Sequence, residues 1–174
     1  PGVIEYVPAY ASLMIVYDPE VTSLDQIGKR LKGLTIKEKR RKASIVMIPI
    51  CYDESLALDK KEFLRRSGQQ WEEIIKLHEG IEYQVYMMGF LPGFLYMGEV
   101  DQRIQISRKK VPRKKIPKGS VGIADAQTGI YPVESPGGWN IIGQSPIAFF
   151  STEGKFPIRA GDRVQFFAVS KKDY

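Results

Sequence analysis

Residues 119–146 combine many glycines with amide, hydroxyl and aromatic side chains. Glycine lets a backbone approach a bound molecule closely, amide and hydroxyl groups can orient a small polar substrate, and tryptophan provides a flat apolar wall. The candidate substrate-binding residues in this segment are Gln127, Thr128, Tyr131, Ser135, Gly137, Gly138 and Trp139. The same composition is also typical of tight turns between strands, in which polar side chains bond to the nearby backbone. Residue spacing does not separate these two interpretations.

A second segment, GFLPGFLYMG at residues 89–98, places aromatic side chains beside residues that bend the backbone. A soluble protein normally buries such side chains, so a rigid turn that presents them indicates the rim of a pocket or a contact with a partner protein. The alternative is that they fill the core of the protein itself. The candidate rim or interface residues are Phe90, Pro92, Gly93, Phe94, Tyr96 and Arg113.

The residues that most often perform catalysis are scarce, and the sequence assigns no catalytic residue. The single histidine, His78, falls on the apolar face of a predicted helix, which favours a place in the core or an interface over a role as a base. The single cysteine, Cys51, lies in an apolar strand pattern, which predicts a buried and unreactive thiol. One histidine and one distant cysteine cannot assemble a metal site, so no metal is predicted. The chain also has no GxxxxGKS or GxxxxGKT segment to hold the phosphates of ATP.

Basic residues are concentrated in SRKKVPRKKIPKG, at residues 107–119. The net charge of +6 arises from 26 basic and 20 acidic residues, which is a moderate excess. Nucleic-acid surfaces usually interleave aromatic residues with basic ones, and this segment has none. A solvated, proline-stiffened loop is therefore favoured, and no nucleic-acid partner is predicted. A phosphate-bearing small molecule is the other ligand that such a loop could bind.

The composition sets broad limits on the class of protein. A chain of 174 residues with 43% hydrophobic content can bury a core as one domain, or as a small domain plus a larger one. No apolar run approaches the roughly 18–20 residues that span a bilayer, so no membrane partner is predicted. A single cysteine suits the reducing cytoplasm, which is the expected location.

The elements that must position these residues fall into two segments. Residues 1–43 predict two strands and one helix, which Thr22 or Ser23 caps, followed by a basic linker at residues 37–42. Two strands and one helix cannot close a core by themselves.

From residue 44 onward the pattern predicts an α+β, mainly β domain. A buried strand at residues 44–51 is followed by two short helices. The first begins at Asp59, with Glu62 as its capping-box partner, and ends at Gly68, and the second spans about residues 70–79. Short strands separated by glycine and proline turns then indicate an antiparallel barrel or sandwich. These strands are predicted at residues 82–89, 103–106, 120–124, 130–133, 146–151 and 162–169.

Several sequence blocks occur in the same order in a known family. The chain resembles the family of the 5-oxoprolinase B-subunit, also called KipI-like or allophanate hydrolase subunit 1, in the blocks IPICYDE, GFLPGFLYMG, SPGGWNIIGQSP and PIRAGDRVQF. The resemblance extends over residues 3–169. It implies a small, ferredoxin-like α+β segment at residues 1–43, truncated relative to other members, and a cyclophilin-like antiparallel β-barrel at residues 44–174. Members often carry glycine at position 125 and arginine at position 144, where this chain has Asp125 and Gln144.

The resemblance also implies an activity and partners. Such a chain acts with a homologous C-subunit (KipA-like) and a metal-dependent A-subunit (LamB/YcsF-like), and the complex uses ATP to open 5-oxo-L-proline to L-glutamate. The isolated chain is expected to be inactive. The alternatives are a KipI-like inhibitor that binds a sensor histidine kinase, and a carboxyltransferase-like subunit that handles carboxylated urea or biotin.

Overall fold

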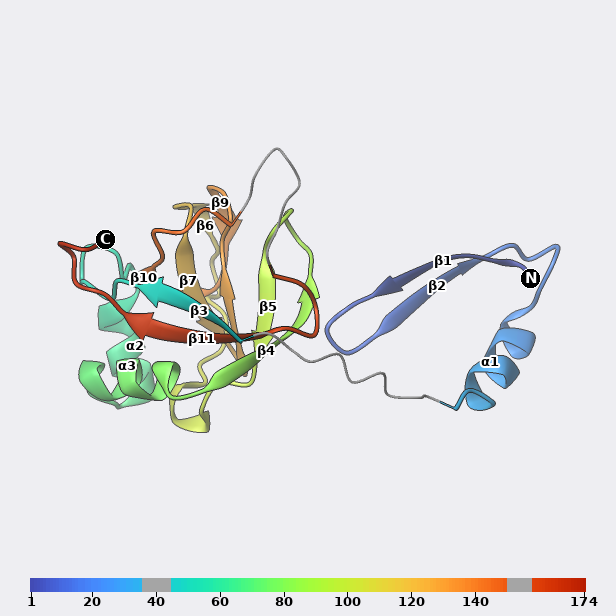
Figure 1. The fold of residues 1–174 in the computed structure, drawn as a ribbon, viewed down its shortest axis with the longest axis horizontal. Helices are drawn as coiled ribbons and strands as arrows, with labels where there is room; N and C mark the ends of the chain where they lie inside the picture. Colours follow the sequence, from blue (N-terminus) through green and yellow to red (C-terminus); the bar gives the residue numbers. More distant parts are fainter. Residues whose placement is uncertain (36–44, 150–157) are drawn as a thin grey trace. The chain divides into compact units, whose positions relative to one another are not determined.

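The computed structural model describes residues 1–35, 45–149 and 158–174 (Figure 1). The chain divides into two compact units, Pro1–Lys42 and Ala43–Tyr174. The domain boundary predicted between residues 43 and 44 and the predicted linker at residues 37–42 lie outside the described residues.

The smaller unit contains two strands and a helix in the predicted order. Strands β1 (Val3–Pro8) and β2 (Leu13–Tyr17) pair antiparallel and are followed by helix α1 (Leu24–Lys32). The Ser23 hydroxyl accepts a hydrogen bond from the Gln26 backbone N–H at 3.3 Å, and the Gln26 side-chain oxygen accepts one from the Ser23 N–H at 3.3 Å. This reciprocal capping box confirms Ser23 as the residue at which the helix begins.

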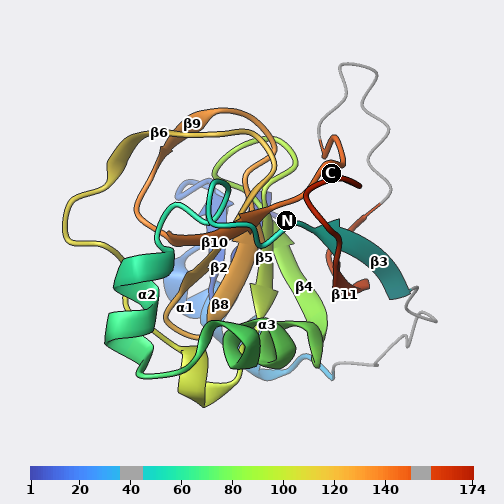
Figure 2. The ribbon, with the colours of Figure 1, turned by 90° about the vertical axis from the view of Figure 1, so that its left-hand side faces the viewer.

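A seven-stranded sheet forms the larger unit (Figures 1 and 2). Its strands are β3 (Ile45–Ile50), β4 (Glu82–Met88), β5 (Leu95–Gly98), β7 (Ser120–Ala124), β8 (Gln127–Ile130), β10 (Asn140–Gln144) and β11 (Arg163–Ala168). They lie in the order β10-β7-β8-β5-β4-β11-β3. The sheet curls until its outermost strands meet, where Gln144 and Cys51, the latter buried, exchange backbone hydrogen bonds of 2.9 and 3.0 Å. The predicted mainly β architecture is thus confirmed, while its cyclophilin-like character stays a prediction.

The prediction of a wholly antiparallel sheet is wrong at one edge. Strand β11 pairs with β4 antiparallel but with β3 parallel, in a register that joins Arg163 to Ile45 and Ala168 to Ile50. Parallel neighbours need a long crossover connection, and here most of the unit lies between the two strands in sequence. Hydrophobic patterns within each strand carry no information about the direction in which such distant strands pair.

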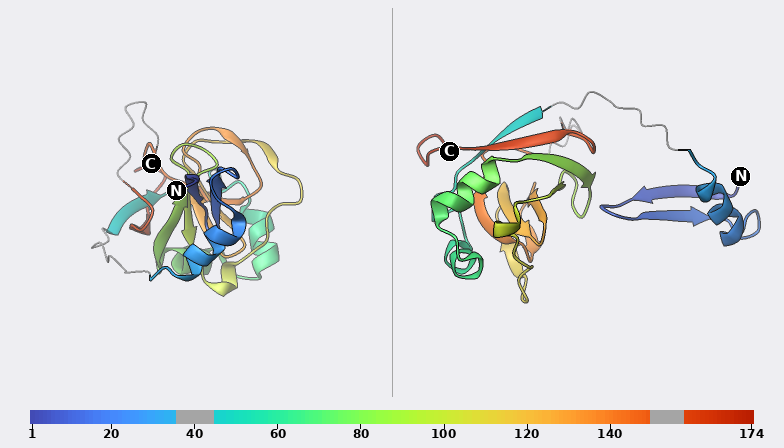
Figure 3. Two further views of the ribbon diagram at one scale, coloured as in Figure 1. Left: turned by 90° about the vertical axis from the view of Figure 1, so that its right-hand side faces the viewer. Right: turned by 90° about the horizontal axis from the view of Figure 1, so that it is seen from below.

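A separate two-stranded sheet and three helical segments complete the larger unit. Strands β6 (Arg113–Ile116) and β9 (Ser135–Gly137) pair antiparallel. Helix α2 (Lys60–Ser67) packs against β10, and helix α3 (Trp71–Glu79) packs against β11 (Figure 3). Gly68 ends α2 in the left-handed conformation at φ 69°, as predicted. None of the helices in the described part of the chain is long and apolar enough to cross a membrane.

The predicted capping box of α2 is wrong. Asp59 stands at the N-cap position, but its side chain makes no capping hydrogen bond. The carboxylate instead binds Lys109 Nζ at 2.7 Å, Arg113 Nη1 at 2.6 Å and the Ile141 backbone N–H at 2.8 Å. Two cations, one from the loop before β6 and one from β6 itself, therefore compete successfully with the local backbone for this carboxylate.

Several predicted strands differ from the structure. Residues 102–104 form a 3-10 helix in place of a strand, because the Asp101 carboxylate accepts a hydrogen bond from the Arg103 N–H and closes a turn. The strand predicted at residues 130–133 lies earlier, as β8. No strand forms at residues 146–149, and the rest of that predicted strand lies outside the described residues. Strands β5, β6, β9 and β10 were not predicted.

The single histidine lies in the core, as predicted. His78 is fully buried, with Nδ1 2.8 Å from the Tyr52 hydroxyl and Nε2 2.9 Å from the Thr128 hydroxyl. Because Thr128 donates its own proton to the Gly122 carbonyl oxygen at 3.2 Å, it accepts from Nε2–H, and Nδ1 accepts from Tyr52. Burial lowers the pKa of His78 to about 3, so the ring is neutral at physiological pH.

Candidate functional site

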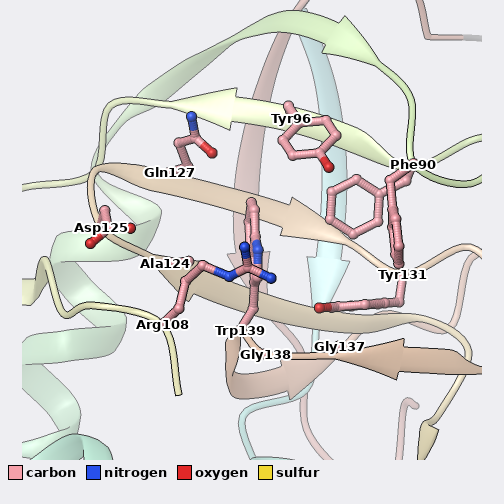
Figure 4. Close-up of a pocket in the computed structure, with 11 residues that line it drawn as sticks. Phe90, Tyr96, Arg108, Ala124, Asp125, Gln127, Tyr131, Gly137, Gly138 and Trp139 are labelled. Carbon is pink, nitrogen blue, oxygen red and sulfur yellow. The ribbon is translucent and has the colours of Figure 1, made fainter. Parts of the chain in front are cut away.

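A pocket of about 130 Å³ opens where several turns of the larger unit converge (Figure 4). Its walls come from the turn between β4 and β5, the loop before β6, and the ends of β7, β8 and β9. The lining residues are Phe90, Phe94, Tyr96, Arg108, Ala124, Asp125, Gln127, Tyr131, Gly137, Gly138 and Trp139. The two segments singled out in the sequence, residues 89–98 and 119–146, thus contribute to one pocket.

Aromatic rings form one side of the pocket. Phe94 lies at their centre, 5.0 Å from the Tyr131 ring and 5.4 Å from the Trp139 ring, and both contacts are edge to face. Phe94 is 1% exposed, whereas Phe90, 5.6 Å away, is 58% exposed. The aromatic turn therefore divides into a buried anchor, Phe94, and an exposed rim residue, Phe90.

Two glycines bring the backbone close to these rings. A Cβ on Gly129 would lie 2.6 Å from the Leu95 carbonyl oxygen and 2.9 Å from the Trp139 ring. A Cβ on Gly137 would overlap the Tyr131 hydroxyl and would lie 2.8 Å from the ring of that residue. Real Cβ atoms do not approach other atoms so closely, so these two positions are restricted to glycine by packing.

Gly138 has a different environment. A Cβ at this position would lie 3.6 Å from Nη2 of Arg108, which is an ordinary van der Waals contact. The Lys109 N–H donates a hydrogen bond to the Gly138 carbonyl oxygen at 2.8 Å, which fixes the loop before β6 beside this residue. Gly138 therefore faces the guanidinium group of Arg108 and leaves room beside it.

The polar side of the pocket contains one cation. Arg108 makes no hydrogen bond or ion pair with any described residue, so its guanidinium is available to a ligand. Burial raises the pKa of Tyr131 to about 12 and that of Tyr96 above its ordinary value, although the charge of Arg108 acts in the opposite direction on both. Both phenols therefore stay protonated. In the view of Figure 4, Asp125 and Gln127 lie at the end of the pocket away from Phe90.

The backbone is unusual at two lining residues. Phe90 has φ 65° and Asp125 has φ 52°, and within the described ranges they are the residues other than glycine with positive φ. Each such conformation costs about 1–3 kcal/mol and persists only where the surrounding structure enforces it. That both of these residues line the same pocket supports a functional role for it.

The remaining predicted site residues lie outside the pocket. Thr128 points into the core toward His78. Ser135 is buried, and its hydroxyl has no hydrogen-bond partner among the described residues. Pro92 and Gly93 shape the aromatic turn without lining the pocket. Their roles in binding stay predictions.

Arg113 also lies elsewhere, and three lining residues were not assigned from the sequence. The Arg113 guanidinium is bound to Asp59, so it helps to anchor the basic segment. The unassigned residues are Arg108, Ala124 and Asp125. Of these three residues, only Asp125 could have been selected from the sequence. Family members often carry glycine at this position, which indicates a backbone with positive φ. Arg108 belongs to a segment that is basic throughout, and nothing local distinguishes it from its neighbours.

No group of three histidine, cysteine, aspartate or glutamate side chains is placed to hold a metal ion in residues 1–35, 45–149 and 158–174. The pocket instead offers one guanidinium, one carboxylate, one carboxamide and phenol hydroxyls around a small apolar space. This set of groups can bind a small anion with a flat ring and an amide.

Comparison with known proteins places the chain in a family. The model of the carboxyltransferase domain, subdomain C and D, matches residues 1–159. The 5-oxoprolinase B-subunit of Bacillus subtilis (strain 168) is 40% identical over 190 residues, which cover 100% of this chain and 79% of the relative. The chain belongs to the 5-oxoprolinase B-subunit family. A member from Escherichia coli O157:H7 is 33% identical over 170 residues, which cover 95% of this chain and 78% of that protein.

Solved structures of several proteins have a fold similar to that of this chain. TTHA0988 is 39% identical with a TM-score of 0.79, and the match covers 98% of this chain but only 33% of that longer one. PH0987 from Pyrococcus horikoshii is 39% identical with a TM-score of 0.71, covering 99% of this chain and 81% of that one. The urea amidolyase of K. lactis has a TM-score of 0.76 at 16% identity, covering 99% of this chain and 12% of that one. At that identity the similarity concerns the fold alone.

Proposed function

We propose that the chain is a subunit of an ATP-dependent 5-oxoprolinase and that its pocket binds 5-oxoproline. The observation that carries this proposal concerns Arg108. Its guanidinium lines an aromatic pocket and has no hydrogen bond or ion pair within the described residues. The chain that contains this pocket is a member of the 5-oxoprolinase B-subunit family. 5-Oxoproline is a five-membered lactam with one carboxylate. The pocket of about 130 Å³ suits so small a ligand, since sites for drug-sized molecules measure roughly 300–1,000 Å³.

The lining groups match the ligand one by one. The planar guanidinium of Arg108 binds the carboxylate through two hydrogen bonds. Trp139 and Phe90 pack against the ring, while the Gln127 amide donates to the lactam oxygen. The Asp125 carboxylate accepts a hydrogen bond from the lactam N–H and repels the carboxylate of the ligand, so that carboxylate is directed away from Asp125 and toward Arg108.

The chemistry of the reaction explains why ATP is needed. An unactivated lactam resists water, and transfer of the terminal phosphoryl group to its oxygen breaks the P–O bond to ADP and makes the ring carbon electrophilic. Water then adds to that carbon, and the C–N bond breaks as the nitrogen takes up a proton, which leaves an acyl phosphate. A second water molecule releases phosphate and glutamate. The residues of this chain bind and orient the lactam for these steps.

The remaining functions belong to the partners in this proposal. The KipA-like C-subunit, which is homologous to this chain, and the metal-dependent LamB/YcsF-like A-subunit complete the enzyme in the cytoplasm. The chain by itself has no catalytic residue assigned to it, so it is expected to be inactive alone.

Reconstitution of the three subunits tests the proposal. The complex is expected to convert 5-oxoproline and ATP to glutamate and ADP. Arg108→Gln should raise the KM for 5-oxoproline roughly 10- to 100-fold, because a hydrogen bond to a charged group contributes about 1.5–3 kcal/mol.

Lys114→Gln is the matched control, since Lys114 is exposed and does not line the pocket, and the substitution changes the net charge equally. An unchanged KM in Arg108→Gln, or turnover by the isolated chain, would contradict the proposal. Inhibition of a sensor histidine kinase by a chain that supports no ring opening would instead favour the KipI-like alternative.

A further inference from the structure

We propose that a basic groove beside the pocket binds the polyphosphate chain of a nucleotide. The basic groove is lined by Glu62, Arg65 and Arg66 of α2 on one side and by residues 107–111 of the loop before β6 on the other. The one carboxylate among these groups, Glu62, is paired with Lys109. It has a volume of about 550 Å³. This inference rests on the proposed function, because it assigns a place to the phosphate donor of that reaction.

Part of the basic groove is held rigidly. Arg66 donates to the Ser107 carbonyl oxygen at 2.9 Å and to the Ser107 hydroxyl at 2.7 Å. Lys109 Nζ lies 2.7 Å from the Asp59 carboxylate and 2.6 Å from that of Glu62. These contacts join the loop to α2, so the positions of the groove walls are fixed before any ligand arrives.

Three other cations of the basic groove are uncommitted. Arg65, Arg108 and Lys110 make no hydrogen bond or ion pair with the rest of the described chain. They come from both walls of a concave surface, so their charges add within it. Guanidinium groups match the geometry of phosphate oxygens, and an ammonium adds a mobile charge. A rigid frame with free cations is the arrangement that a polyanion requires.

The helix alone does not account for these charges. Basic residues in the last turn of a helix offset its dipole, which explains Arg65 and Arg66 without any ligand. That explanation does not extend to Arg108 and Lys110, which come from an irregular loop. The loop places these two cations close to those of the helix, and the repulsion between like charges is unfavourable. A bound anion would offset that repulsion.

The position of Arg108 favours a polyphosphate over an acidic protein surface. Arg108 lines both the basic groove and the small pocket, so a phosphate at this residue would lie beside a ligand in the pocket. The volume of the groove falls within the roughly 300–1,000 Å³ of small-molecule sites. No aromatic residue lines the groove, so recognition would depend on the phosphates and not on stacking of a base.

Titration of the 174-residue chain with inorganic tripolyphosphate, followed by calorimetry, tests this inference. The wild-type chain should bind, and Arg65→Ala combined with Lys110→Ala should weaken binding by about tenfold or more, because each lost cation removes charge-assisted hydrogen bonds. The matched control combines Lys114→Ala with Lys118→Ala, which removes the same charge from exposed positions outside the groove. The control should bind almost as tightly as the wild type.

Equal weakening in the two double variants would overturn the inference, because it would show a general charge effect. Absence of binding to the wild type would also overturn it. If the Arg65 and Lys110 variant then failed to assemble with the partner subunits, the groove would be a protein-docking surface.

A separate titration distinguishes this failure from failure of the proposed function. In a Trp71→Phe background the fluorescence of Trp139 reports on the pocket, and 5-oxoproline should change it. A response to 5-oxoproline without any binding of tripolyphosphate would leave the proposed function standing and remove the groove alone. Loss of the 5-oxoproline response would count against the proposed function, whatever tripolyphosphate does.

Discussion

Gly137 and Gly138 are neighbours at the pocket but differ in the space around them, so substitutions at the two positions should have different effects. Gly137→Ala places a methyl group against the Tyr131 hydroxyl and 2.7 Å from Ile116. Overpacking of this kind typically costs about 1–3 kcal/mol, so the free energy of unfolding in urea should fall by that amount. Gly138→Ala meets the Arg108 side chain and the Lys109 carbonyl oxygen at ordinary van der Waals distances, and should change stability by less than about 0.5 kcal/mol.

Gly138→Val extends this comparison from stability to binding. The larger side chain would displace the guanidinium of Arg108 while the fold is retained, so the KM for 5-oxoproline should rise in the reconstituted complex. If Gly138→Val destabilises the protein as much as Gly137→Ala does, or leaves the KM unchanged, then Gly138 does not face the ligand.

At the scale of residues, the sequence predicted what is encoded locally. Glycines beside Trp139 and aromatic groups in a turn are unusual combinations, and these signals led to Phe90, Gln127 and most of the other lining residues. Arg108 could not be selected from a run of basic residues. Its guanidinium is unpaired among the described residues because Asp59 forms its ion pairs with other residues of the run. Those pairs join residues about fifty positions apart.

At the scale of elements, the sequence predicted several helix ends and some of the buried strands, but it missed the buried strands β5 and β10 and did not predict strand pairing. Gly68 and the Ser23 capping box depend on neighbouring residues, so their patterns are visible in the chain. Strands β6 and β9 are short and polar, and each forms only because the other is present. The parallel pairing of β3 with β11 likewise depends on contacts between the two ends of the unit.

The His78 network joins α3 to β8, and it makes the stability of the fold depend on pH. Its pKa is lowered from 6.5 to about 3 by burial, so the unfolded chain takes up a proton below pH 6.5 that the folded chain does not. Stability is therefore complete above pH 6.5 and is lost as the pH falls. The slope is about 1.4 kcal/mol per pH unit, which gives a loss of about 2 kcal/mol at pH 5.

Urea unfolding of the wild type and of His78→Gln at pH 7 and pH 5 measures this contribution. Burial raises the pKa of Glu79, which acts in the opposite direction, but that group is present in both proteins and cancels in their difference. The Tyr52 hydroxyl bonds the ring and the Tyr83 hydroxyl donates to the His78 backbone carbonyl oxygen. Both hydroxyls stay neutral, because burial raises the pKa of each. If both proteins lost equal stability between these pH values, His78 would not be the neutral core residue that the structure shows.

At the scale of the whole molecule, we expect the aromatic turn to serve both the fold and the assembly with partner subunits, and we expect its two phenylalanines to divide these tasks. Phe94 contacts Phe90, Tyr96, Tyr131 and Trp139 from within the core. Phe94→Ala should therefore lower the free energy of unfolding by about 3–5 kcal/mol, a large part of the roughly 5–15 kcal/mol that stabilises a domain. Phe90 is exposed, so Phe90→Ala should leave the melting temperature nearly unchanged.

Phe90→Ala should instead weaken assembly with the partner subunits. The Phe90 backbone has an unfavourable φ of 65° and presents the ring to solvent, and burial of that ring by another protein would stabilise the complex. Pull-down and melting measurements on both variants separate the two tasks. If Phe90→Ala assembles normally but binds 5-oxoproline more weakly, the exposed ring belongs to the pocket alone, and the partner must contact another face of the sheet.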